Sequence, residues 1–121
     1  MNKKATGRKG EDIAATFLID KGYNVLYRNW TCRWGELDLI TKFKDVLVFV
    51  EVKFRSSLDF GYPYEAVNYK KKTILARSIK RFLTISNLWD YNWRLDLISI
   101  YVSGGNTNIK HFESIEMDGI F

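Results

Sequence analysis

The chain has 121 residues, a formal net charge of +5 and a single cysteine, Cys32. One cysteine excludes an intrachain disulfide, which fits a reducing compartment. We expect no signal peptide, because no apolar run follows the basic first residues, and no stretch reaches the roughly 18 apolar residues of a membrane span. We therefore expect one cytoplasmic domain over residues 1–121, without membrane contact. Its hydrophobic content of 46% argues against disorder.

Hydrophobic periodicity predicts alternating helices and strands along the chain. Apolar residues four positions apart predict a helix over residues 8–21, which Gly22 ends. The other expected elements are strands at 23–30, 35–40 and 46–54, a loop at 55–64, a helix at 65–85, and strands at 94–102 and 109–115. This order predicts an α/β fold with a central mixed sheet flanked by helices.

Three charged residues lie in the two central strands, where apolar residues surround them. Asp38 belongs to the first strand, and Glu51 and Lys53 belong to the second. Side chains two positions apart share one face of a strand, so Glu51 and Lys53 should lie side by side. A tight hairpin would bring Asp38 alongside them. Burial of such charges costs several kcal/mol each unless they are paired.

This arrangement suits a divalent-metal site. Two carboxylates about 4 Å apart repel by about 4 kcal/mol at an effective dielectric near 20, and a cation removes that repulsion. Mg²⁺ prefers oxygen ligands, which Asp38 and Glu51 would supply together with the backbone carbonyl of Val52. Lys53 could orient or deprotonate a nucleophilic water, or neutralise charge on a phosphate. These parts are typical of metal-assisted phosphodiester hydrolysis.

A purely structural interpretation is also open for each of these residues. Glu51 and Lys53 could form a buried ion pair, with Asp38 capping a turn. Glu11, on the sheet-facing side of the first helix, could be a charge favoured by the helix dipole or an auxiliary metal ligand. Asp96, an acid in another apolar run, should pair with Arg94 or a helix lysine, or support the site from outside.

The acidic residues and lysine resemble the signature of the restriction-endonuclease-like superfamily, the PD-(D/E)xK nucleases, with Leu37 where that signature has proline. A longer ordered set between roughly Lys9 and Val102 resembles the YraN-like family of small, largely uncharacterised bacterial proteins. The set comprises Gly10-Glu11, Ala14, Ala15, Arg28-Asn29, residues 35–40 and 48–53, Arg55, Phe60-Gly61, Pro63, residues 65–67 and Lys70. The chain is similar, more distantly, to archaeal Holliday-junction resolvases, which use a glutamate of the first helix with the same strand motif.

The resemblance implies a restriction-endonuclease-like three-layer α/β/α fold with a central mixed sheet. It also implies a nuclease that uses Mg²⁺ or Mn²⁺, with Asp38, Glu51 and Lys53 as catalytic residues and Glu11 as an auxiliary metal ligand. The predicted pI of 9.3 indicates a nucleic-acid partner, most simply DNA. Arg55, Lys70, Lys72 and Arg77 are the expected phosphate-binding residues. A symmetric junction substrate would favour a homodimer.

Two other functions fit the same sequence. A non-cleaving nucleic-acid-binding module would keep the fold and bind DNA in a salt-dependent way without cutting it. A protein-interaction adaptor would bind neither DNA nor Mg²⁺. Cys32 is expected to be a packing residue, and no catalytic role is expected for His111. The four tryptophans are expected to serve packing.

Overall fold

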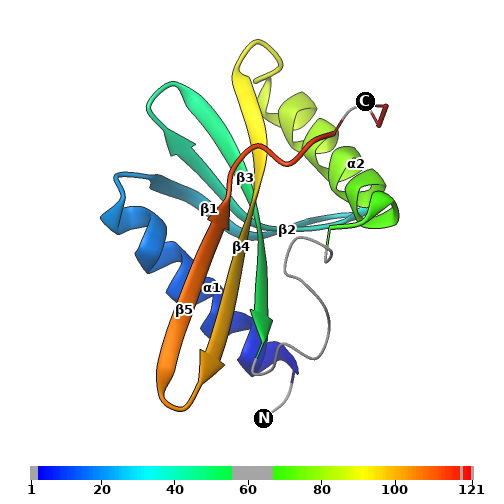
Figure 1. The fold of residues 1–121 in the computed structure, drawn as a ribbon. Helices are drawn as coiled ribbons and strands as arrows, with labels where there is room; N and C mark the ends of the chain where they lie inside the picture. The colour runs from blue at the N-terminus through cyan, green and yellow to red at the C-terminus, as the bar shows by residue number, and fades with distance from the viewer. Residues whose placement is uncertain (1–2, 56–66, 118, 121) are drawn as a thin grey trace.

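A computed structural model of the chain describes residues 3–55, 67–117 and 119–120 (Figure 1). The elements are α1 (Lys3–Asp20), β1 (Asn24–Cys32), β2 (Gly35–Phe43), β3 (Val46–Arg55), α2 (Tyr69–Ser86), β4 (Asn92–Ser103) and β5 (Asn106–Phe112). Neither described helix is long and apolar enough to cross a membrane.

The strands form one five-stranded mixed sheet whose spatial order follows the sequence, β1-β2-β3-β4-β5. Short turns join β1 to β2, β2 to β3 and β4 to β5, and these three pairs are antiparallel. The central pair, β3 and β4, is parallel. Parallel neighbours need a crossover connection, and α2 lies within the one that links them. The predicted mixed sheet is therefore confirmed.

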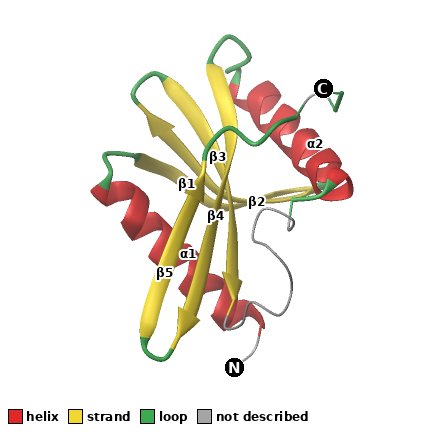
Figure 2. Ribbon diagram, in the orientation of Figure 1, coloured by secondary structure: helices red, strands yellow, loops and turns green. Residues whose placement is uncertain are grey.

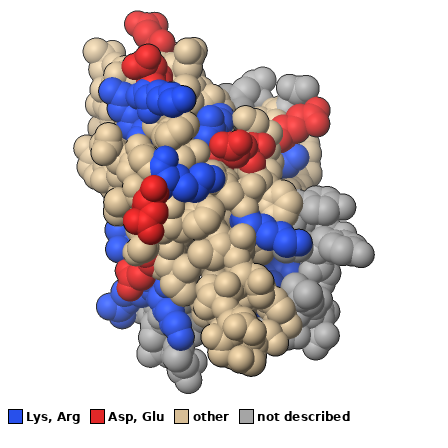
Figure 3. Space-filling model, turned by 60° about the vertical axis from the view of Figure 1, so that its left-hand side comes forward, with Lys and Arg blue, Asp and Glu red and all other residues tan. Residues whose placement is uncertain are grey.

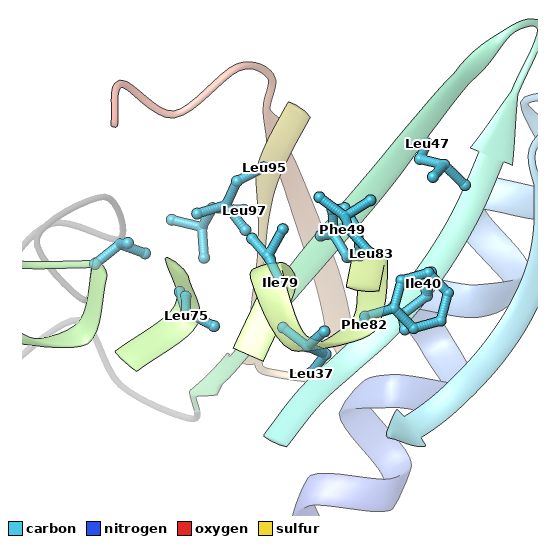
Figure 4. Close-up of a cluster of buried hydrophobic side chains, with 11 residues drawn as sticks. Leu37, Ile40, Leu47, Phe49, Leu75, Ile79, Phe82, Leu83, Leu95 and Leu97 are labelled. Carbon is cyan, nitrogen blue, oxygen red and sulfur yellow. The ribbon is translucent and has the colours of Figure 1, made fainter. Parts of the chain in front are cut away.

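The two helices cover opposite faces of the sheet, which makes three layers (Figure 2). On one face, Leu75, Ile79 and Leu83 of α2 pack on Phe49 and Leu97 (Figure 4). On the other face, Ala14 and Leu18 of α1 pack on alternate residues of β3 and β4, including Val48, Val50, Ile98 and Ile100. Because both faces are covered, β3 is apolar on both sides. The predicted three-layer α/β/α fold is confirmed.

Several predicted boundaries were wrong by a few residues. The second helix begins at Tyr69, not at residue 65, because Asn68 caps it and accepts a hydrogen bond from the N–H of Lys71. The last strand covers Asn106–Phe112 instead of 109–115, since a two-glycine turn lets pairing begin at once. Arg55 belongs to β3, not to the predicted loop. The rest of that loop, with Glu65 and Ala66, lies outside the described residues.

Candidate active site

Carboxylates from α1 and β2 converge at one end of the sheet. Oxygen atoms of Glu11, Glu36 and Asp38 all lie within 4.8 Å of one another, and we call these three residues the acidic cluster. Glu11 is buried, Asp38 is half-buried and Glu36 is exposed. The acidic cluster therefore extends from the buried side chain of Glu11 to the solvent-exposed side chain of Glu36. Sequence reasoning predicted Glu11 and Asp38 for this site but not Glu36, which lies two positions before Asp38 on the same strand.

Glu51 adjoins the acidic cluster from β3. The antiparallel register pairs Leu39 with Val50, so one further step sets Asp38 opposite Glu51. Their carboxyl groups share a hydrogen bond, and the Val52 N–H donates to Asp38 Oδ2 at 2.8 Å. The hairpin predicted from the sequence thus brings the two carboxylates together. Val52 contacts Asp38 through its amide, whereas the prediction for Val52 concerned its carbonyl.

Asp38 binds its proton unusually tightly. Burial, which is the largest cause, acts together with the hydrogen bond to Glu51 and the charge of Glu51 to raise the pKa of the Asp38 carboxyl from 3.8 to about 9. The Val52 N–H opposes this shift. Two adjoining carboxyl groups that cannot both ionise share one proton at neutral pH. A divalent cation would replace that proton, as metal binding does at protonated ligands.

Lys71 of α2 forms an ion pair with Glu51 at the site. Its Nζ lies 2.9 Å from Glu51 Oε2, and the Glu51 side chain is only 7% exposed. Burial lowers the pKa of the Lys71 ammonium, but the charge of Glu51 and its hydrogen bond outweigh this and raise it. Lys70 and Lys72 were predicted as phosphate-binding residues, and neither of them forms this ion pair. Lys71 is four positions before the buried Leu75, so both lie on the same side of α2. This spacing is the signal in the sequence from which the contact of Lys71 with the sheet could have been predicted.

Lys53 lies beyond Glu51 on β3 and is exposed. It forms no ion pair with Glu51, which pairs with Lys71 instead. The predictions that Lys53 is buried and that the two could form a buried ion pair are therefore wrong. The apolar stripe of α2 covers β3 at Leu47 and Phe49, and β3 runs past that cover before it reaches Lys53. Because the Lys53 ammonium is exposed and forms no ion pair with Glu51, it can contact a substrate without first breaking that interaction.

Glu11 is held in place by the close approach of α1 to β3. A Cβ added at Gly10 would lie 2.8 Å from the Phe54 Cβ, so only glycine allows this separation. Burial raises the pKa of Glu11, and a side-chain hydrogen bond with Asn29 opposes that shift. Asn29 has a φ of 53°, a left-handed conformation that asparagine adopts more readily than most residues. Asn29 was not among the predicted site residues.

The expected phosphate-binding residues differ in their exposure. Lys70 and Arg77 are exposed on α2, and Lys72 is half-buried. Arg55 is half-buried at the end of β3 and makes contacts of its own. On the face shown in Figure 3, basic and acidic side chains are interspersed. The positive charge is therefore mixed with acids on that face.

Asp96 belongs to a separate and internally satisfied network. It is fully buried, it receives hydrogen bonds from Arg94 Nε at 3.0 Å and the Ser114 N–H at 3.0 Å, and His111 Nε2 lies 2.7 Å from it. Burial raises its pKa, but these partners more than reverse the effect and lower it. The predicted pairing of Asp96 with Arg94 is confirmed. Although Asp96, His111 and Glu113 are close enough to hold a metal, Arg94 already contacts both carboxylates.

These features define a class of protein: a three-layer α/β/α protein with a cluster of carboxylates at the end of its central sheet. Residues 10–100 match the model of the uncharacterised protein family UPF0102, and the chain belongs to that family. The resemblance to the YraN-like family, which is the same family, is thereby confirmed.

Full-length relatives support this assignment. A UPF0102 protein of Caldanaerobacter subterraneus is 43% identical over 85% of this chain and 84% of its own length. Another from Clostridium acetobutylicum is 44% identical over 88% of this chain and 86% of its own. A third from Carboxydothermus hydrogenoformans is 37% identical over 95% of this chain and 98% of its own. The names of these relatives state no activity.

Proposed function

We propose that this protein is a divalent-metal-dependent nuclease that hydrolyses DNA phosphodiester bonds, with branched or otherwise structured DNA among the candidate substrates. The observation that carries the proposal is the convergence of Glu11, Glu36 and Asp38 within 4.8 Å, next to the Asp38–Glu51 pair. Such a concentration of carboxylates at the edge of a core is costly without a counter-charge. A catalytic cation would supply that charge.

The donor atoms fit Mg²⁺ or Mn²⁺. Every candidate ligand is an oxygen, and the mixture of buried Glu11 and exposed Glu36 leaves one side of the cluster open to solvent. Mg²⁺ is usually held by one or two carboxylates and keeps several waters, which a partly open site permits. Asp38 and Glu51 would hold the metal, with Glu11 and the Val52 carbonyl as auxiliary ligands. When bound, Mg²⁺ supplies charge that polarises a phosphoryl oxygen and acidifies water.

The remaining chemistry belongs to side chains of this protein. Lys53 places an exposed positive charge beyond Glu51, where it would orient the nucleophilic water or stabilise charge on the phosphate that is attacked. The proposed phosphate contacts, Arg55, Lys70, Lys72 and Arg77, would hold the DNA backbone. Neutralisation of phosphates releases counterions, so this binding should weaken as salt rises.

One observation favours a second function, a nucleic-acid-binding module that does not cleave. The Lys71 ammonium already neutralises Glu51, and the proton that Asp38 retains neutralises the Asp38 carboxyl itself. Those two contacts would stabilise the site without metal. In that case DNA binding should persist, but neither Mg²⁺ nor Mn²⁺ should bind to the carboxylates.

The test is cleavage of labelled single-stranded, duplex, flap and four-way-junction DNA with Mg²⁺ or Mn²⁺. Asp38→Ala and Lys53→Ala should each abolish cleavage. The matched controls Asp45→Ala and Lys44→Ala, in the exposed β2–β3 turn, should retain it. Cleavage that survives Asp38→Ala would assign the activity to another site. DNA binding without cleavage, and without Mn²⁺ binding by calorimetry, would favour the non-cleaving module.

A further inference from the structure

The tip of the β1–β2 hairpin carries an exposed aromatic residue between two arginines. Trp34 is 42% exposed. The guanidinium carbon of Arg33 lies 4.8 Å from the centre of its ring, and that of Arg77, from α2, lies 5.1 Å from it. We call these three residues the arginine–tryptophan cluster. Of the other tryptophans, Trp30 and Trp93 pack in the core with Phe82 and Phe49.

Close packing of the β1–β2 hairpin on α2 positions the cluster. Gly35 approaches the helix so closely that an added Cβ would lie 2.9 Å from Ile74 Cγ2. Cys32, the last residue of β1, lies against Ser78 with its Sγ 3.7 Å from the hydroxyl oxygen. The hairpin and the helix are therefore fixed relative to each other at the point where Arg33 and Arg77 meet Trp34. This fixation reduces the conformational freedom that two arginines on separate surface elements would otherwise have.

The two guanidinium groups retain their hydrogen-bonding capacity. Within the described ranges, neither Arg33 nor Arg77 forms an ion pair with a carboxylate. A guanidinium that stacks on an aromatic ring keeps its N–H groups directed outward at its edge, where they match the geometry of a phosphate. Two such groups held on one ring form a site for an anionic backbone, not for a neutral ligand.

We propose that the arginine–tryptophan cluster is a phosphate clamp that binds the DNA backbone at a fixed distance from the acidic cluster. The choice of DNA as the ligand rests on the proposed function. Trp34 immediately precedes β2 and is four residues before Asp38 in the sequence. Trp34 acts as a positioning residue, and the arginines contact phosphate.

The test is DNA binding by fluorescence anisotropy in EDTA, where cleavage does not occur. The probes are a 20-nucleotide fluorescein-labelled single strand and the corresponding duplex, titrated from 50 to 200 mM salt. Arg33→Gln/Arg77→Gln should weaken single-strand binding about 20-fold at 0.1 M salt and lower the salt slope by about 1.4. The matched control Lys44→Gln/Lys110→Gln removes the same charge from distant exposed positions and should change affinity no more than about twofold.

Two further variants separate position from charge. Trp34→Ala should weaken binding about fivefold without changing the salt slope, because both charges remain but lose their support. Trp34→Phe should recover part of that loss. Circular dichroism of each variant verifies folding.

The outcomes separate this inference from the proposed function. Equal loss in the arginine variant and the lysine control, or no binding by the wild-type protein, overturns the clamp. A specific loss in the arginine variant supports it even if Mg²⁺-dependent cleavage is never observed, a result that would count against the nuclease alone.

Discussion

Replacement of Asp38 by asparagine should stabilise the metal-free protein, and increasingly so as pH rises. The folded-state pKa of Asp38 is about 9 and its ordinary value is 3.8. Between these values the folded chain keeps a proton that the unfolded chain releases. The contribution of Asp38 to the free energy of unfolding is therefore fully present below about pH 4. It falls by about 1.4 kcal/mol per pH unit as pH rises toward 9. From pH 6 to pH 8 the wild-type protein should lose about 3 kcal/mol from this group.

Asparagine imitates the protonated carboxyl, since its oxygen can accept from the Val52 N–H and its amide can donate to Glu51. Asp38→Asn should therefore remove most of this pH dependence. The measurement is urea unfolding at pH 6, 7 and 8, with and without 10 mM Mg²⁺. Mg²⁺ should stabilise the wild-type protein most at pH 8, because it replaces the proton, and should have little effect on the variant.

Asp45→Asn provides the control, because Asp45 is an exposed carboxylate in the β2–β3 turn. It should leave both the pH slope and the Mg²⁺ response unchanged. Equal pH slopes in wild type and Asp38→Asn would refute the assignment of a retained proton to Asp38. Equal Mg²⁺ stabilisation in both proteins would show that the metal does not use this carboxylate.

Three further substitutions test the packing and charge around the site. Lys71→Met should cost about 1–2 kcal/mol in urea unfolding, because it leaves the buried Glu51 carboxylate without its cation. Gly10→Ala should destabilise by about 1–3 kcal/mol through a clash with Phe54, although alanine is normally favoured in a helix by about 1 kcal/mol. Asp96→Asn should cost about 2–4 kcal/mol at pH 7, and the same stabilisation should be lost in the wild-type protein below about pH 4, because its pKa is lowered. DNA cleavage per folded molecule should not change in this last variant.

Matched changes make these results interpretable. Lys70→Met removes the same charge one position away on an exposed part of α2 and should alter stability by less than about 0.5 kcal/mol. Thr16→Ala, at an exposed position of α1, reports the effect of alanine where nothing clashes. If Gly10→Ala stabilised the protein, the tight approach of α1 to β3 would be wrong. If Lys71→Met matched Lys70→Met, the ion pair with Glu51 would contribute nothing.

The sequence alone determined the fold class and the pairing of the central acids. The continuous apolar run along β3 predicts a strand that is covered on both faces, and a period near 3.6 along the helices identifies which helical side chains face the core. Because a short turn fixes the register of an antiparallel hairpin, Asp38 and Glu51 could be expected to meet across it. The same local rules made Arg94, two positions away on one strand face, one of the expected partners of Asp96, and the structure shows that pair.

Contacts between distant elements could be decided only by the tertiary structure. Whether Lys70, Lys71 or Lys72 reaches Glu51 depends on how far α2 is shifted and rotated over the sheet, which the whole apolar interface sets. The entry of Glu11 into the acidic cluster requires the packing of α1 on β3 through Gly10. The meeting of Arg77 with Trp34 requires the β1–β2 hairpin to extend under α2. Local periodicity specifies the face of each element, but relative placement follows from the packing of the complete core.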